Sequence, residues 1–171
     1  MRLNAPSMLT RTELDADALL QSCIVCCAKQ LNLDEQSVHR QLRNGSCQAH
    51  SLLRYTIAKR LADYLGRLGG GICGVYLYGS AMNDTAQPNS DIDLVILVER
   101  KLDQARTLLQ QLDLALLTSY RALIGIARVP RSLLDVHLVD TEEEKMRRSY
   151  GAVIHSLQTS PVCLWKRTSA Q

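Results

Sequence analysis

Two aspartates and a glycine–serine pair are the residues of this chain whose types and spacing are best suited to chemistry. Gly79 and Ser80 follow an apolar run, and after ten further residues Asp91 and Asp93 open a second apolar run, 94–98. Residues two apart in a β-strand point to the same side, so the two carboxylates are expected to lie together. Like charges this close repel unless a cation lies between them, and carboxylate oxygens suit hard ions such as Mg²⁺. The stretch therefore predicts a metal site at the ends of two neighbouring strands.

The turn before the aspartates adds groups that can hold a phosphate chain. Gly79 lets the backbone approach a ligand closely. If the segment that follows is helical, its free N–H groups and the Ser80 hydroxyl can bind phosphate oxygens. Ser90 is grouped with them as a nucleotide-binding residue, because it adjoins Asp91 and can orient the metal ligands.

A third carboxylate, Asp135, lies in the alternating apolar run 133–140, which is typical of a strand. Alternation places His137 on the same face, where it either contacts the substrate or is a partly buried histidine with a hydrogen bond. Three carboxylates can hold two metal ions, one activating an attacking hydroxyl and one bridging the phosphates. Asp135 is therefore expected to complete the metal site.

Length and composition indicate one globular domain, with room for a small appended unit. The chain has 171 residues, of which 46% are hydrophobic, with no Phe and one Trp. The core must therefore be built from Leu, Ile, Val and Ala. The net charge of +3 is compatible with an anionic ligand such as a nucleotide. It falls short of a nucleic-acid-binding signature.

The six cysteines are scattered through the chain, and most lie in apolar surroundings. Cys23, Cys26 and Cys27 could form part of a zinc site with His39 or His50 downstream, but they follow a helical apolar pattern that favours a role in the core. No secretory leader or membrane span is evident in the sequence. We therefore expect a cytoplasmic protein with reduced thiols and no membrane contact.

The periodicities predict an α/β (α+β) domain with a small mixed β-sheet flanked by helices. The expected helices span 14–31, 35–43, 46–68, 102–124 and 141–149, and the expected strands 75–78, 94–98, 133–140 and 161–165. The segment 151–154 is compatible with either helix or strand. In the third helix the basic residues Arg54, Lys59, Arg60 and Arg67 are expected to face solvent.

Three residues, Tyr78-Gly79-Ser80, then ten residues, then Asp91-Ile92-Asp93, and a later strand with Asp135 together form a rarer pattern than any part alone. The pattern resembles the DNA polymerase β-type nucleotidyltransferase superfamily, and in particular its minimal nucleotidyltransferase (MNT) group, whose motif is Gly-Ser-x10-Asp-x-Asp. The resemblance covers about residues 52–165 and implies the nucleotidyltransferase fold. We therefore expect residues 1–46 to be a helical N-terminal extension and 47–171 the nucleotidyltransferase domain.

The resemblance also implies an activity and roles for the motif residues. Such proteins move a nucleoside monophosphate from a nucleoside triphosphate to a hydroxyl, with release of pyrophosphate. Gly79 and Ser80 would bind the triphosphate, Asp91 and Asp93 would bind two Mg²⁺ ions (with Mn²⁺ as an alternative), and Asp135 would bind one of them and help to deprotonate the acceptor. ATP is the favoured nucleotide, so that AMP is the group transferred.

The acceptor is left open by the sequence. Acceptors in the superfamily include small molecules, RNA 3′ ends and protein hydroxyls, and MNT proteins resemble antitoxins that pair with HEPN-domain partners. For this chain a small molecule or a partner protein is favoured over nucleic acid, and the acceptor site can be completed by a partner or by a second subunit. The alternative function is an antitoxin-like or regulatory nucleotide-binding protein with weak or no turnover.

Overall fold

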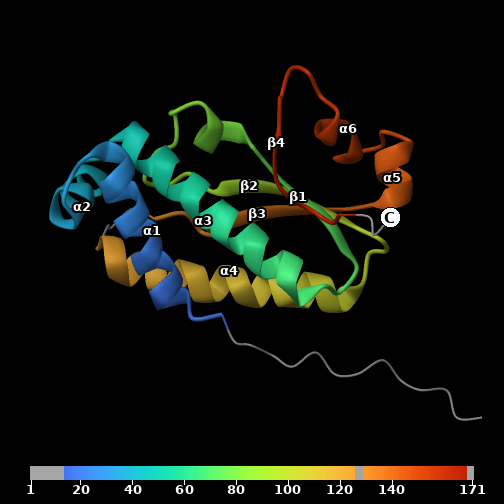
Figure 1. The fold of residues 1–171 in the computed structure, drawn as a ribbon, viewed down its shortest axis with the longest axis horizontal. Helices are drawn as coiled ribbons and strands as arrows, with labels where there is room; N and C mark the ends of the chain where they lie inside the picture. Colours follow the sequence, from blue (N-terminus) through green and yellow to red (C-terminus); the bar gives the residue numbers. More distant parts are fainter. Residues whose placement is uncertain (1–13, 126–128, 169–171) are drawn as a thin grey trace, which may run out of the picture.

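A computed structural model describes residues 14–125 and 129–168, so the segment that precedes the first expected helix, 1–13, lies outside the described residues. Among the described residues, four strands form one mixed sheet in the order β3-β2-β1-β4 (Figure 1). Its members are β1 (Ile72–Tyr78), β2 (Ile92–Val98), β3 (Leu134–Asp140) and β4 (Val162–Lys166). β1 is antiparallel to β2 and β4, whereas β2 and β3 are parallel. The predicted small mixed sheet is confirmed.

Long helices cover one face of this sheet, as Figure 1 shows. They are α1 (Ala16–Leu31), α3 (Cys47–Leu68) and α4 (Asp103–Ile124), with the shorter α2 (Glu35–Arg43) at one end. Their apolar side chains and those of the strands form one buried cluster. The helices therefore support the sheet from one side, with α3 and α4 against the strands and α1 packed on α3 and α4.

Side-chain caps determine where the first three helices begin. Asp15, Asp34 and Ser46 each accept a hydrogen bond from a backbone N–H three residues later, at 2.9, 2.7 and 3.3 Å. Such caps satisfy N–H groups that have no partner within the helix. Because Asp15 is the cap, α1 begins two residues later than the apolar periodicity predicts.

The opposite face of the sheet carries a smaller apolar cluster and two short helices. Tyr76, Val95, Leu97 and Val139 are its buried members, with side chains of α6 (Gly151–Ile154) packed against them. The segment whose sequence is compatible with helix or strand is thus a helix. Since only short elements cover this face, polar side chains on it can remain accessible.

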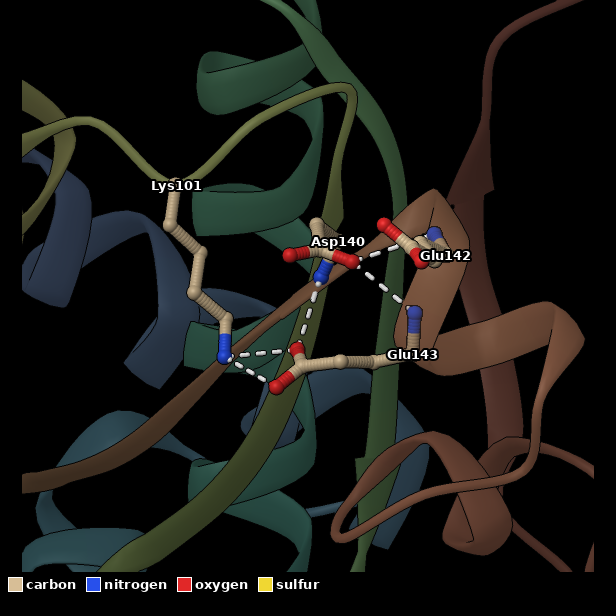
Figure 2. A network of polar contacts seen from close by, with 4 residues as sticks. All are labelled: Lys101, Asp140, Glu142 and Glu143. Carbon is tan, nitrogen blue, oxygen red and sulfur yellow. Dashed lines mark hydrogen bonds and ion pairs between the residues drawn. The ribbon is translucent and has the colours of Figure 1, made fainter.

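α5 (Thr141–Lys145) directly follows β3 and is shorter than the helix expected to reach residue 149. Its capping box is formed by Asp140 and Glu143: the Asp140 carboxylate accepts from the Glu143 N–H at 2.8 Å, and the Glu143 carboxylate accepts from the Asp140 N–H at 3.2 Å. Lys101 pairs with Glu143 at 2.6 Å (Figure 2). The helix ends early because the backbone enters the left-handed region at Arg147 and again at Ser149.

The cysteines match their expected role, whereas one basic residue of α3 does not. All six cysteines are free, and burial raises the pKa of Cys23 to about 12 and that of Cys27 to about 11, as expected for core thiols. Arg54 does not face solvent: it is fully buried, whereas Lys59 and Arg60 on the same helix are exposed. No described helix combines the length and the apolar character that a membrane span requires.

Candidate metal and nucleotide site

Three carboxylates converge on the face of the sheet that the long helices leave open. Asp91, Asp93 and Asp135 each offer an oxygen within 4.8 Å of the other two, and within the described ranges they are the group suited to hold a metal ion. All three side chains are partly exposed. A ligand can therefore reach them from solvent.

Strand pairing explains why residues so distant in sequence meet. Asp93 lies opposite Tyr78 at the end of β1 and opposite Asp135 in the parallel β2–β3 ladder. Paired residues in neighbouring strands point to the same face. Asp91 immediately precedes β2, two residues before Asp93. The sheet register thus brings together the three acids expected from the sequence.

The electrostatics of the cluster favour a cation. The pKa of Asp93 is raised to about 6, first by burial and then by the neighbouring carboxylates of Asp91 and Asp135. His137 and a hydrogen bond from the Ser80 backbone N–H lower it only in part. A divalent ion would neutralise the crowded oxygens. The residues present fit such an ion.

Gly79 is required by the close approach of the turn to this cluster. Its φ of +81° lies in the left-handed region, and a Cβ at this position would overlap the carboxylate of Asp93. Only glycine combines that backbone conformation with the absence of a side chain. The glycine of the Gly-Ser pair therefore makes room for the Asp93 carboxylate.

Ser80 lies in η1 (Gly79–Met82), a single 3₁₀ turn that follows β1. Its carbonyl accepts from the Asn83 and Thr85 N–H groups, both at 3.3 Å, and its backbone N–H lowers the pKa of Asp93. The Ser80 side chain is partly exposed beside the carboxylates. The segment is helical, as the phosphate-binding hypothesis requires, but its short turn offers fewer free N–H groups than an α-helix would.

Ser90 is built into the connection that leads to Asp91. Its hydroxyl accepts a hydrogen bond from the Gln87 N–H at 2.9 Å, and its carbonyl accepts from the Arg54 guanidinium. Both contacts stabilise the backbone just before Asp91. Contact between Ser90 and a nucleotide stays a prediction.

His137 and Tyr150 flank the third acid. The His137 Nε2 lies 3.3 Å from an Asp135 carboxylate oxygen, and its ring stacks on Tyr150 with centroids 3.4 Å apart. The Asp135 side chain is 46% exposed, against 23% for His137. Sequence reasoning missed Tyr150, since it lies in an irregular segment with no motif. The stack holds the imidazole against Asp135.

Asp113 of α4 determines where β3 begins. One of its carboxylate oxygens accepts from the Leu133 and Leu134 N–H groups, both at 2.8 Å, and the other accepts from the Ser132 hydroxyl at 2.7 Å. These three bonds place the start of the strand that carries Asp135. Asp113 lies in the middle of an amphipathic helix, so the sequence pattern did not indicate this role.

A cleft of about 430 Å³ lies beside the carboxylates along β3. Asp135, His137 and Tyr150 contribute to its wall, together with the basic residues Lys101 and Arg106. β3 is one of the two edge strands of the described sheet, so the cleft is open along that side. It offers space for a molecule that approaches Asp135.

The mixed sheet with three carboxylates on its open face is the arrangement expected for a nucleotidyltransferase domain. A family model described as "Polymerase beta, Nucleotidyltransferase" matches residues 59–149, which is more than half of the chain. The protein therefore belongs to the polymerase β-type nucleotidyltransferase superfamily and carries its nucleotidyltransferase domain. The match includes the Gly-Ser turn and all three acids, so the predicted superfamily and fold are confirmed. Searches of the curated proteins and of the solved structures each gave no match.

Proposed function

We propose that this protein is a Mg²⁺-dependent nucleotidyltransferase that moves AMP from ATP to a hydroxyl acceptor. The acceptor oxygen forms a bond to the α-phosphorus, the bond between that phosphorus and the oxygen bridging to the β-phosphate breaks, and pyrophosphate leaves. The observation that carries the proposal is the convergence of Asp91, Asp93 and Asp135 within 4.8 Å next to the Gly79-Ser80 turn. Membership of the superfamily supports it.

The carboxylates are assigned as metal ligands. Asp91 and Asp93 would hold two Mg²⁺ ions, or Mn²⁺ in their place, and Asp135 would hold one of them. When bound, the ions would neutralise phosphate charge and lower the pKa of the attacking hydroxyl. The raised pKa of Asp93 supports this assignment, because after burial its causes are the neighbouring carboxylates of Asp91 and Asp135, whose repulsion a cation would relieve.

The remaining residues of the site orient substrate and move a proton. We assign Gly79 and Ser80 to the triphosphate and Ser90 to the support of the adjoining ligand. Asp135 takes the proton of the acceptor hydroxyl, a role that its partly exposed side chain allows. His137, 3.3 Å from that carboxylate, holds its orientation.

The acceptor is assigned to the cleft beside Asp135, whose wall that carboxylate joins. A cleft open along the edge strand suits a small molecule or a side-chain hydroxyl of a partner protein, such as a HEPN-type partner or a second copy of this chain. Residues 1–46 are assigned to a helical extension and 47–171 to the catalytic domain. Because α1 shares the buried cluster with α3, we expect 47–171 alone to fold poorly.

Thermal unfolding in a series of nucleotides tests the donor half of the reaction. We expect ATP to raise the melting temperature in the presence of Mg²⁺ more than CTP, GTP or UTP, and to do so much less without metal. The Asp91→Asn/Asp93→Asn variant should lose the Mg²⁺-dependent part. If no nucleotide has a metal-dependent effect on the wild-type protein, the proposed activity is wrong.

Transfer itself is tested with ATP labelled at the α-phosphate, incubated with the protein and a cell extract. The expected result is label attached to an acceptor in the wild type and absent from the double variant. Binding of Mg²⁺–ATP without label transfer to any acceptor would replace the enzyme by a nucleotide-binding regulatory protein of the antitoxin type.

A further inference from the structure

A buried positive charge lies on α3, directly behind the connection that leads to the metal site. The Arg54 side chain is fully buried, and no carboxylate pairs with it among the residues that the structure describes. Burying a guanidinium sacrifices hydration that carbonyl groups replace only in part, and apolar side chains at such positions are often as stable or more so. Stability alone therefore does not account for an arginine at this position.

The hydrogen bonds of Arg54 go to the backbone just before Asp91. Its Nε and one terminal nitrogen donate to the Ser90 carbonyl at 3.0 and 2.7 Å, and the same terminal nitrogen donates to the Pro88 carbonyl at 3.1 Å. The Ser90 carbonyl belongs to the peptide bond that joins Ser90 to Asp91. The planar fork of the guanidinium thus fixes the orientation of the peptide that carries a metal ligand.

Two side chains hold the guanidinium in that orientation. Its other terminal nitrogen donates to His50 Nδ1 at 2.9 Å, and the Tyr120 ring lies 5.7 Å from the guanidinium carbon. The His50 Nε2 lies 2.8 Å from the Leu42 carbonyl and donates to it. Burial and Arg54 lower the pKa of His50 to about 4. A neutral imidazole accepts at Nδ1, as the contact with Arg54 requires.

A second contact from α3 anchors the same connection upstream. The Ser51 hydroxyl accepts from the Ala86 N–H at 3.0 Å, and Ala86 is fully buried. The connection therefore bonds to α3 at residues 86, 88 and 90. A single helix, from the layer opposite the open face, shapes the approach to Asp91.

We propose that Arg54 is a positioning residue for the metal site. By fixing the Ser90–Asp91 peptide, it directs the Asp91 carboxylate toward those of Asp93 and Asp135. The inference rests on the proposed function in so far as that site binds metal. The other part of the inference, that Arg54 holds the backbone of the connection before Asp91, does not depend on catalysis.

The test compares Arg54→Met and Arg54→Lys with a control on the same helix, Leu61→Ala, in the full-length protein. Leu61 is fully buried two turns further along α3, so its truncation should lower the melting temperature by roughly 5–15 °C without affecting the connection. Two quantities are measured: hydrogen exchange of the peptide covering residues 83–92, and the Mg²⁺ concentration that half-saturates the thermal shift with ATP.

In Arg54→Met we expect amide exchange in 83–92 to rise at least tenfold above that of Leu61→Ala, and the half-saturating Mg²⁺ concentration to rise at least tenfold. Arg54→Lys should fall between this variant and the wild type, because an ammonium can donate to one carbonyl but lacks the fork. If Arg54→Met does not fold, the same two measurements on Arg54→Lys and Leu61→Ala decide the question.

The outcomes separate the two proposals. Wild-type exchange and wild-type Mg²⁺ dependence in the folded Arg54 variants would overturn the role of Arg54 while leaving the proposed function intact. Absence of any Mg²⁺ effect in the wild type would overturn the proposed function, and faster exchange in Arg54→Met would still show that the arginine holds the connection. A lower melting temperature alone, with both readouts unchanged, would show a structural role only and overturn the inference.

Discussion

The two faces of the sheet are built from the same strands but differ in role: one packs against helices, and the other carries the accessible acids. On the helix-covered face, Val75 and Leu77 of β1 are fully buried in the large apolar cluster. On the open face, Asp93 of β2 and Asp135 of β3 remain accessible. Because side chains alternate along a strand, each acid is flanked in sequence by residues buried on the other side. The packed face therefore fixes the backbone from which the acids project.

The polar groups of the two faces also differ in how they are satisfied. On the helix side, His50 and Arg54 are buried with hydrogen-bond partners on several sides. On the open side, burial and neighbouring negative charge both raise the pKa of Asp93, and no cation of the chain is paired with it among the described residues. The polar groups of the helix-covered face have partners within the chain, whereas on the open face a bound cation would supply the missing positive charge.

The largest expected effect comes from removing one carboxylate of the open face. Asp93→Asn should lower the rate of nucleotidyl transfer at least about a thousandfold, because a group placed to stabilise transition-state charge is lost. Label transfer at saturating Mg²⁺–ATP measures it. Glu99→Gln is the matched control, since Glu99 follows the far end of β2 and pairs with Arg167. Similar losses in both variants would contradict the assignment.

Gly79→Ala should disturb the open face through the backbone. The new methyl group would overlap the Asp93 carboxylate, and the positive φ adds strain, so we expect a loss of about 1–3 kcal/mol in the free energy of unfolding and a loss of most activity. Gly69→Ala has a similar φ of +72° but nothing within 4 Å of the added Cβ. It should lower stability without lowering activity, as urea unfolding and transfer assays can show.

Metal should stabilise the protein by relieving the repulsion on the open face. At a Mg²⁺ concentration a hundred times its Kd, the expected gain is about 2.7 kcal/mol, or roughly 5–10 °C in melting temperature. Asp93→Asn should melt above the metal-free wild type and show almost no response to Mg²⁺. If Asp93→Asn is instead less stable than the metal-free wild type, the Asp93 carboxylate is not destabilised by its negatively charged neighbours.

The faces should respond to acid in opposite directions. His50 has a folded-state pKa of about 4, below its ordinary 6.5, so the unfolded chain binds the proton first and stability falls as the pH drops from about 6.5 to 4. The loss is at most about 1.4 kcal/mol per pH unit. Asp93 has a folded-state pKa of about 6, above its ordinary 3.8. In the metal-free protein the folded state therefore binds this proton first, and stability rises as the pH falls from about 6 to 3.8.

Urea unfolding between pH 7 and pH 4.5 separates these two contributions. His50→Asn should be less sensitive to acid than the wild type, and metal-free Asp93→Asn should be more sensitive. Parallel stability profiles for the three proteins would show that neither group is linked to folding in the stated sense.

The smallest expected effect lies at the far end of β3, where Lys101, Asp140 and Glu143 meet (Figure 2). Glu143→Ala removes half of the capping box and a partly exposed ion pair, so it should lower the free energy of unfolding by about 1 kcal/mol, as urea unfolding can show. In Glu142→Ala the residue keeps the backbone N–H that bonds to Asp140, and the cost should be smaller. Because Glu143 also lines the cleft assigned to the acceptor, a loss of transfer larger than this loss of stability would support that assignment.

The parts of the site that could be predicted are those encoded within short stretches. Gly79, Asp91 and Asp93 lie within one strand–turn–strand unit, and the alternation that buries Ile92 also directs its two neighbours to the other face. Asp135 could be predicted because its own strand shows the same alternation. The fold and the three acids could therefore be predicted from residue type and from the alternation of side chains along each strand.

What could not be predicted depends on contacts between distant segments. Arg54 shares its helix with the exposed Lys59 and Arg60, and its carbonyl partners lie 34 and 36 residues away, so no local pattern separates it from a solvent-facing arginine. Tyr150 reaches His137 from an irregular segment with no repeating pattern. Such roles arise only once the chain has folded.

The three bonds from Asp113 to the start of β3 have a consequence for the evolution of the site. They tie the strand to the middle of α4 rather than to the connection that joins the two elements. Residues can therefore be inserted or deleted in that connection without shifting Asp135 along β2, since the register is reset downstream of it. The separation between the second and third acids of this chain can therefore change without moving Asp135, because Asp113 holds the first amides of β3 in place.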